Sequence, residues 1–270
     1  MGCILFFGGS AMIINENNVG IQTFTPYTYN TYGEYTCSPR YLFESCQEVA
    51  AMHAALRGMA VPDLLKEGKT WVIAREKMII QRYPVWGDTI LMKTGVPDAK
   101  SYFAPRSMIA LDSDGKEFYR ASTMWAIVDY NTRMPVRVGE YYEKMGFAKD
   151  EDFVDYSLKR EPKIDTQRLL EKKPVAVFTP QIFFYDCDIN NHINNIVYLD
   201  WILRTVPMSY MKTHKPSMID IMWIHEVHMD DTVTVSMYEI EKDYFGFIVN
   251  RPSDNSNVCT AEIRFYGEEA

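Results

Sequence analysis

The order of expected secondary structure repeats along the chain, since one helix and then several strands occur twice. In the first half one of these strands opens with Asp88-Thr89-Ile90, and in the second half Asp231-Thr232-Val233 stands 143 residues later. Each helix has to bury its apolar stripe, and a curved antiparallel sheet can cover it. The sequence therefore predicts an α+β fold built from two similar repeats.

The first helix is predicted to begin at Ser38-Pro39. A serine side chain accepts hydrogen bonds from the free N–H groups of a first turn, and proline suits the first helical position. Beyond it, apolar residues recur at spacings of three and four until Gly58 supplies a stop. The residues of this stripe are Leu42, Cys46, Val49, His53 and Leu56. The second helix is predicted over Ile193–Val206 from the same kind of spacing.

Other segments rich in β-forming residues are predicted to be strands, with turn sequences such as Asp112-Ser113-Asp114-Gly115 between them. In the first repeat these strands are Trp71–Met78, Thr89–Thr94, Arg106–Leu111 and Ser122–Asp129; in the second they are Ala176–Tyr185, Met218–Val227, Thr232–Ile240, Tyr244–Asn250 and Asn257–Tyr266. The stretch between the repeats is charged and contains proline. The expected division is a first repeat at 1–148, a linker at 149–173 and a second repeat at 174–270.

Composition and charge exclude several classes of protein. Hydrophobic residues make up 47% and charged residues 24%, which is the balance of a globular chain. The net charge of −8 argues against a general binder of nucleic acid or of an anionic membrane surface. Charged residues interrupt every apolar run before it reaches the length of a membrane span. The five cysteines form no CxxC pair, which favours reduced thiols and a cytoplasmic location.

The first fourteen residues are apolar, but they lack the basic start and the cleavage site of a signal peptide. Two interpretations remain open. Either this segment is a first strand of the fold, or the true start is Met12 and residues 1–11 are an extension.

The densest group of polar side chains lies where the second repeat passes from a strand into its helix, over residues 186–201. Asp188, Asn190 and His192 alternate there, so all three would project from one face of an extended segment. Asn194 would enter the helix, whose first N–H groups carry partial positive charge and suit an anionic transition state. The alternative is an arrangement that only caps the helix.

This cluster resembles the D-x-N-x-H-x-N-N…Y…W-I-L motif of the acyl-ACP thioesterases, matched here by residues 188–195, Tyr198 and residues 201–203. The first half resembles the same family at residues 47–49, 71–75, 83–88 and 125–135. The resemblance extends from about residue 20 to the C-terminus. It implies a tandem hotdog fold, in which a long helix is wrapped by a curved antiparallel sheet, twice. It also implies hydrolysis of fatty acyl-acyl carrier protein, which releases the fatty acid and ends chain elongation.

The resemblance further implies the residues of the active site. Asp188, Asn190 and His192 stand where the family has catalytic residues, and Glu226 matches the glutamate of its R-E-C segment. The cysteine of that segment is Val227 here, so a cysteine nucleophile cannot act from this position.

Thioester hydrolysis requires attack on the carbonyl carbon and stabilisation of the negative charge that develops on its oxygen. The hypothesis is that Glu226 acts as general base on a water, while Asn190 and His192 donate hydrogen bonds to the carbonyl. Asp188 either orients these side chains or attacks the carbonyl directly, and both routes stay open. Cys187 alternates away from Asp188 and is expected to be buried rather than reactive.

No metal or cofactor is expected. His225-Glu226-Val227-His228 is not the H-E-x-x-H motif of zinc enzymes, and in a strand its two histidines would face opposite sides. The sequence contains neither a P-loop nor a G-x-G-x-x-G motif, so no nucleotide cofactor is implied.

The resemblance implies an acyl carrier protein as partner and an acyl tunnel in the first repeat. The candidate tunnel residues are Met52, Ala54, Ala55, Met59, Met78, Trp86 and Met108, with His53 at the border. Because the carrier protein and this chain are both acidic, their contact requires a local basic patch. The candidate patch residues are Lys159, Arg160, Lys163, Arg168, Lys172 and Lys173.

Two other functions remain open. One is an acyl-CoA thioesterase on the same fold, and the other is a non-catalytic acyl-binding protein, which the complete Asp–Asn–His–Glu set disfavours. The preferred chain length, and whether the chain forms a homodimer, also stay open because the sequence does not show the shape of the tunnel or of the surface.

Overall fold

The computed structural model describes residues 11–97, 102–149, 158 and 161–267. The chain divides into two compact units. Unit 1 consists of Met1–Ala74 and Met78–Glu161, and unit 2 consists of Arg75–Lys77 and Pro162–Ala270.

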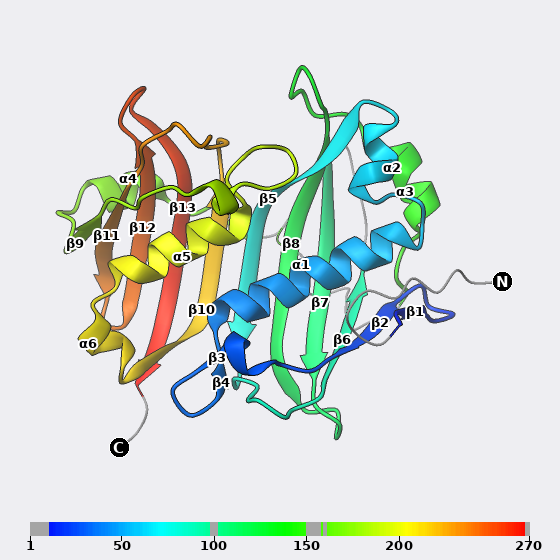
Figure 1. The fold of residues 1–270 in the computed structure, drawn as a ribbon, viewed down its shortest axis with the longest axis horizontal. Coiled ribbons are helices and arrows are strands. Elements are labelled where there is room, and N and C mark those ends of the chain that lie inside the picture. Colours follow the sequence, from blue (N-terminus) through cyan, green and yellow to red (C-terminus); the bar gives the residue numbers. More distant parts are fainter. Residues whose placement is uncertain (1–10, 98–101, 150–157, 159–160, 268–270) are drawn as a thin grey trace. The chain divides into compact units, whose positions relative to one another are not determined.

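Unit 1 combines one long helix with an antiparallel sheet (Figure 1). The helices are η1 (Thr28–Asn30), α1 (Pro39–Ala55), α2 (Val61–Leu65) and α3 (Gly139–Met145). The strands are β1 (Ile13–Ile14), β2 (Gly20–Phe24), β3 (Thr31–Tyr32), β4 (Thr36–Cys37), β5 (Lys69–Ile80), β6 (Ile90–Gly95), β7 (Phe103–Leu111) and β8 (Glu117–Asp129). Strands β2, β6, β7 and β8 pair antiparallel in turn, and β5 follows β8.

Unit 2 has the same composition of elements. Its helices are α4 (Thr166–Leu170), η4 (Phe184–Asp186), α5 (Asn195–Thr205) and α6 (Met208–Met211). Its strands are β9 (Ala176–Phe178), β10 (His214–Trp223), β11 (Thr234–Glu241), β12 (Tyr244–Arg251) and β13 (Ser256–Gly267). Strands β9, β11, β12, β13 and β10 pair antiparallel in that order.

The two sheets share one strand order. In unit 1 the order is β2-β6-β7-β8-β5, and in unit 2 it is β9-β11-β12-β13-β10. In each unit the long helix precedes the last four of these strands in the sequence and packs on the sheet, α1 against β2 and β6, and α5 against β9, β11 and β12. The predicted α+β tandem hotdog is therefore confirmed.

The start of α1 follows the sequence rules. Ser38 is the N-cap, and its side chain accepts a hydrogen bond from the backbone N–H of Tyr41, while Pro39 occupies the first turn. The predicted stripe faces the core, because Leu42, Cys46, Val49 and His53 are all fully buried. The helix predicted from Ser38-Pro39 is confirmed.

The strand predicted over Ala176–Tyr185 is mostly wrong, because β9 ends at Phe178. Pro180 has no N–H to donate to a strand ladder, and the chain then forms the 3₁₀ turn Phe184–Asp186. Only the first three residues of the predicted strand therefore pair in the sheet.

Part of the segment expected to be a linker packs into the core of unit 2. Leu169, on α4, is fully buried among Tyr238, Ile240, Tyr244 and Ile248. A Cβ added at Gly246 would overlap the side chain of Leu169, so this close approach requires glycine. Residues 150–157 and 159–160 of the expected linker lie outside the described residues.

The prediction for the N-terminal segment falls mostly outside the described residues, since the structure describes the chain from residue 11. Within the described ranges, no helix combines the length and the apolar character that a membrane crossing requires.

Candidate functional site

Residues 188–192 form a tight loop rather than an extended strand. The backbone N–H of Asp188 donates to the carbonyl of His192 at 2.7 Å, and that of Asn191 donates to the carbonyl of Asp188 at 3.0 Å. Asn191 has a φ of +65°, in the left-handed region that asparagine tolerates better than most residues. The expectation that Asp188, Asn190 and His192 project from one face of an extended segment is therefore wrong.

The carboxylate of Asp188 closes this loop. Its Oδ1 accepts hydrogen bonds from the backbone N–H groups of Asn190 at 2.8 Å and His192 at 3.2 Å. Its Oδ2 accepts one from Asn190 Nδ2 at 3.3 Å. Aspartate side chains often compete in this way with regular backbone pairing. Asp188 thus fixes the positions of both other residues of the motif.

Asn190 has one polar atom without a partner. Its Oδ1 is buried and accepts no hydrogen bond from any residue in the described part of the chain. Its Nδ2 has a second N–H besides the one donated to Asp188. This side chain therefore has one N–H left to donate to a ligand.

Helix α5 starts directly after the loop. Asn194 is its N-cap, and the Asn194 side chain accepts a hydrogen bond from the backbone N–H of Ile196 at 2.9 Å. The backbone N–H of Ile193 donates to the carbonyl of Val227 at 2.8 Å. This second bond ties the start of α5 to the segment that contains Glu226.

Glu226 lies in a loop after β10, so the prediction that it stands in a strand is wrong. The reason is that the N–H groups of Ile224 and His225 both donate to the carbonyl of Val258, at 2.9 and 3.2 Å. Two successive residues then oppose one partner, which ends the ladder between β10 and β13. The prediction that His225 and His228 face opposite sides of a strand fails for the same reason.

The loop brings Glu226 to His192. The distance from His192 Nδ1 to Glu226 Oε1 is 3.5 Å. The side chain of His192 is 18% exposed and that of Glu226 is 36% exposed, so a substrate can reach both. The His228 ring lies edge-on to the His192 ring, with 4.9 Å between the centroids. The hydrogen bonds of Asp188 hold Asn190 and His192 in one loop, and Glu226 lies beside the His192 ring, so the four predicted residues lie close together.

Arg251, at the end of β12, holds the Glu226 loop. Its Nη1 donates to the backbone carbonyl of Glu226 at 3.1 Å and to Asp231 Oδ2 at 3.3 Å. Asp231 also accepts from the backbone N–H of His228 at 2.9 Å. Hydrogen bonds to Asp254 and Asp231 raise the pKa of Arg251 above its usual range. The sequence analysis missed Arg251, since no local motif connects it with Glu226.

The cysteine positions differ in part from the expectation. Cys187 is partly exposed rather than buried, while Val227 is fully buried. Backbone pairing between Cys187 and Ile193 sets the base of the loop.

Within the described ranges, no three His, Cys, Asp or Glu side chains are grouped so that they could hold a metal ion.

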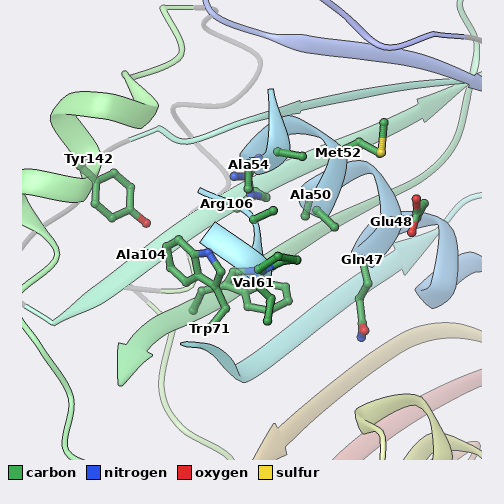
Figure 2. Close-up of a pocket in the computed structure, with 15 residues that line it drawn as sticks. Gln47, Glu48, Ala50, Met52, Ala54, Val61, Trp71, Ala104, Arg106 and Tyr142 are labelled. Carbon is green, nitrogen blue, oxygen red and sulfur yellow. The ribbon is translucent and has the colours of Figure 1, made fainter. Parts of the chain in front are cut away.

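Unit 1 contains an apolar pocket of about 330 Å³ (Figure 2). Residues of α1, α2, β5, β7, β8 and α3 line it: Gln47, Glu48, Ala50, Ala51, Met52, Ala54, Ala55, Ala60, Val61, Pro62, Trp71, Ala104, Arg106, Trp125 and Tyr142. Glu48, Ala51 and Pro62 are exposed, whereas Ala104 and Arg106 are buried. The pocket thus runs from the surface into the core of unit 1.

Three of the candidate tunnel residues line this pocket, namely Met52, Ala54 and Ala55. Met59, Met78 and Met108 are core residues that do not line it, and Trp86 is 52% exposed. The sequence analysis missed the aromatic walls, Trp71, Trp125 and Tyr142, which become neighbours only through strand pairing and helix packing. His53 is buried behind the wall and contacts Arg106.

Comparison with protein-family models gives two matches in tandem. The acyl-ACP thioesterase N-terminal domain matches residues 29–145, and the acyl-ACP thioesterase C-terminal domain matches residues 171–267. The second match contains the loop 188–192 and Glu226.

Curated relatives include two plant enzymes. Palmitoyl-acyl carrier protein thioesterase from Gossypium hirsutum is 25% identical over 83% of this chain and 56% of its own length. Oleoyl-acyl carrier protein thioesterase 1 from Arabidopsis thaliana is 26% identical over 78% of this chain and 61% of its own length. The chain thus spans between half and two thirds of the length of these relatives.

Solved structures share the fold. The acyl-ACP thioesterase from Bacteroides thetaiotaomicron superposes with a TM-score of 0.76 at 24% identity, over 93% of this chain and 99% of that chain. The 12:0-ACP thioesterase from Umbellularia californica superposes with a TM-score of 0.77 at 20% identity, over 93% and 98% of the two chains.

Proposed function

Since the chain belongs to the acyl-ACP thioesterase family, we propose that it hydrolyses fatty acyl-acyl carrier protein. Water adds to the thioester carbonyl carbon, the C–S bond breaks, and the products are a free fatty acid and the carrier thiol. The observation that carries the proposal is the cluster in unit 2. There His192 Nδ1 lies 3.5 Å from Glu226 Oε1, and Asp188 holds the loop 188–192 that contains His192.

Glu226 is the general base in this proposal. Its carboxylate takes a proton from the attacking water, and the neighbouring His192 ring positions the carboxylate or relays the proton. The negative charge on the carbonyl oxygen needs a donor, and the second N–H of Asn190 can supply one.

Asp188 is proposed as a positioning residue rather than as the nucleophile. Three hydrogen bonds already occupy its carboxylate, two from backbone N–H groups and one from Asn190. A carboxylate whose oxygens already accept hydrogen bonds has fewer lone pairs available to attack a carbonyl carbon. This geometry supports the route through activated water over direct attack.

Replacing Asp188 separates these two routes. Asp188→Ala should lower kcat by about 10-fold or more, because the loop loses its acceptor. Asp188→Asn keeps an oxygen that accepts from the two backbone N–H groups, so it should recover much of the activity. The measurement is steady-state hydrolysis of acyl-ACP, with thermal unfolding as a check of the fold. An Asn variant as slow as the Ala variant would instead favour direct attack.

The pocket of unit 1 is proposed as the acyl-chain site, in agreement with the expected role of the first repeat. Its wall is formed mainly by alanine, methionine and tryptophan side chains, which suit a hydrocarbon chain. Its volume of about 330 Å³ lies at the small end of the usual range for ligand pockets, about 300–1,000 Å³.

Hydrolysis of an acyl-ACP chain-length series by the purified protein tests the function directly. The same acyl chains on CoA form the second arm, and Asp188→Ala is the control. Turnover of acyl-ACP supports the proposal. Turnover of acyl-CoA alone would indicate the acyl-CoA thioesterase, and turnover of neither would indicate an acyl-binding protein.

The carrier protein is proposed to dock on basic side chains next to α4. Lys163, Arg168 and Lys173 are exposed there. Lys172 is different, because its Nζ donates to the backbone carbonyls of Glu239 and Ile240 at 2.8 and 3.3 Å. Lys159 and Arg160, also expected in this patch, lie outside the described residues.

Replacing Lys163, Arg168 and Lys173 together by glutamine should raise KM for acyl-ACP and leave KM for acyl-CoA unchanged. Exposed charge pairs contribute about 0.2–1 kcal/mol each, so loss of all three should raise KM by about 3- to 150-fold. The control is Lys66→Gln, at an exposed lysine of unit 1. An unchanged ratio of the two KM values would rule out this docking surface.

The cytoplasmic location predicted from composition is retained as a proposal. It rests on the thiols, since Cys37, Cys46, Cys187 and Cys259 are all free.

A further inference from the structure

The unit 1 pocket has a buried, charged side chain among the residues that line it. Arg106, on β7, is 5% exposed, and it is a lining residue of an otherwise mainly apolar pocket (Figure 2). Its Nη1 lies 3.0 Å from His53 Nδ1 and donates to Thr94 Oγ1 at 3.2 Å. Its Nη2 contacts Met145 Sδ at 3.7 Å. All of these partners are neutral groups.

Arg106 has no carboxylate partner among the residues that the structure describes. Another buried guanidinium of this chain, that of Arg75, does have a carboxylate partner. Its Nε and Nη2 donate to the two oxygens of Asp220, at 2.8 and 2.6 Å. Burial of an ion is unfavourable unless a counter-charge or a full set of hydrogen bonds compensates it. The unpaired charge of Arg106 therefore needs an explanation other than stability.

His53 adds a second donor to this cluster. Arginine only donates hydrogen bonds, so Nδ1 of His53 accepts from Arg106 and its ring hydrogen is on Nε2. Nε2 is buried and has no hydrogen-bond partner among the described residues. Burial and the neighbouring guanidinium groups of Arg106 and Arg57 lower the pKa of His53 to about 2, so the ring is neutral. The cluster thus has unused donor capacity and no acceptor that carries negative charge.

We infer that Arg106 binds an oxygen atom carried by the acyl chain, at the end far from the thioester. The inference rests on the proposed function and specifies its substrate: an acyl group whose distal end bears a carboxylate or a hydroxyl group rather than a methyl group. Both groups offer a further acceptor oxygen to the remaining N–H groups of the guanidinium, and a carboxylate also neutralises its charge. A site built around such a bond rejects an analogue without the oxygen strongly, because the buried donor is then left unpaired.

The test compares three acyl-ACP substrates of equal chain length that end in a methyl, a hydroxyl or a carboxylate group. The wild-type protein should hydrolyse one or both oxygen-bearing chains with a kcat/KM about 10-fold or more above that of the methyl chain. Arg106→Met should reverse this preference, because it replaces the guanidinium of a lining residue with an apolar group. Met145→Leu is the matched control, since it alters a contact of Arg106 and keeps the guanidinium, and it should keep the preference.

Thermal unfolding gives a second readout. Arg106→Met should raise Tm, because it removes an uncompensated buried charge. Faster or equal hydrolysis of the methyl chain by the wild-type protein would overturn the inference while the proposed function stands. Absence of turnover with all three substrates would overturn both. The wild-type comparison decides the question even if Arg106→Met fails to fold.

Discussion

Glu226→Gln should lower kcat for acyl-ACP hydrolysis by about 10²–10⁴-fold, which is the usual contribution of a general base. Glutamine has nearly the same shape as glutamate and leaves the loop intact, but it cannot take a proton from water. The backbone carbonyl of Glu226 keeps its hydrogen bond from Arg251, so the variant should unfold at the wild-type temperature. KM should change little, because the carboxylate is needed for the chemical step rather than for binding.

The control for this prediction is Glu239→Gln, at an exposed carboxylate of unit 2 away from the cluster. His192→Ala should also lower kcat by about 10-fold or more. If His192 and Glu226 act as one unit, the double variant should be hardly slower than the slower single variant. Wild-type turnover by Glu226→Gln would show that another group activates the water.

The second large effect is expected for the stability of unit 2. Asp220→Ala should lower the free energy of unfolding by about 3–5 kcal/mol, because it leaves Arg75 buried without its counter-charge. The two side chains are only 9% and 6% exposed, and both guanidinium–carboxylate hydrogen bonds are short, at 2.8 and 2.6 Å. Urea denaturation, with the midpoint and the slope measured together, checks this value.

The control pair is Arg40 and Glu44 on α1, which are 45% and 38% exposed. Glu44→Ala there should change the free energy of unfolding by less than about 1 kcal/mol. Replacing Arg75 and Asp220 together by Met and Leu should restore much of the loss, since no unpaired charge remains. A loss of less than about 1 kcal/mol for Asp220→Ala would mean that water reaches the pair.

Several features of the fold follow from local rules and could be predicted. The cap at Ser38, the proline after it and the stripe from Leu42 to His53 define α1, because helix periodicity decides which side chains face the core. The strands after each helix were predicted from β-forming residues and the turn sequences between them, and their ends are right to within a few residues. The motif at residues 188–192 was singled out because polar side chains are dense there and because it resembles a family motif.

The tertiary structure decided what those residues do. Whether Asp188 continues a strand or closes a loop depends on its hydrogen bonds from Asn190 and His192, which compete with strand pairing. The position of Glu226 depends on two N–H groups that share the carbonyl of Val258.

The sequence by itself thus determined the two repeats, their long helices and the identity of the polar cluster, because these depend on periodicity and on short-range hydrogen bonds. Only the tertiary structure placed Glu226 beside His192, Arg251 on the Glu226 loop and Arg106 among the residues that line an apolar pocket. These contacts join residues far apart in the sequence, and their free energy depends on burial and on the charge of neighbours that no local pattern encodes.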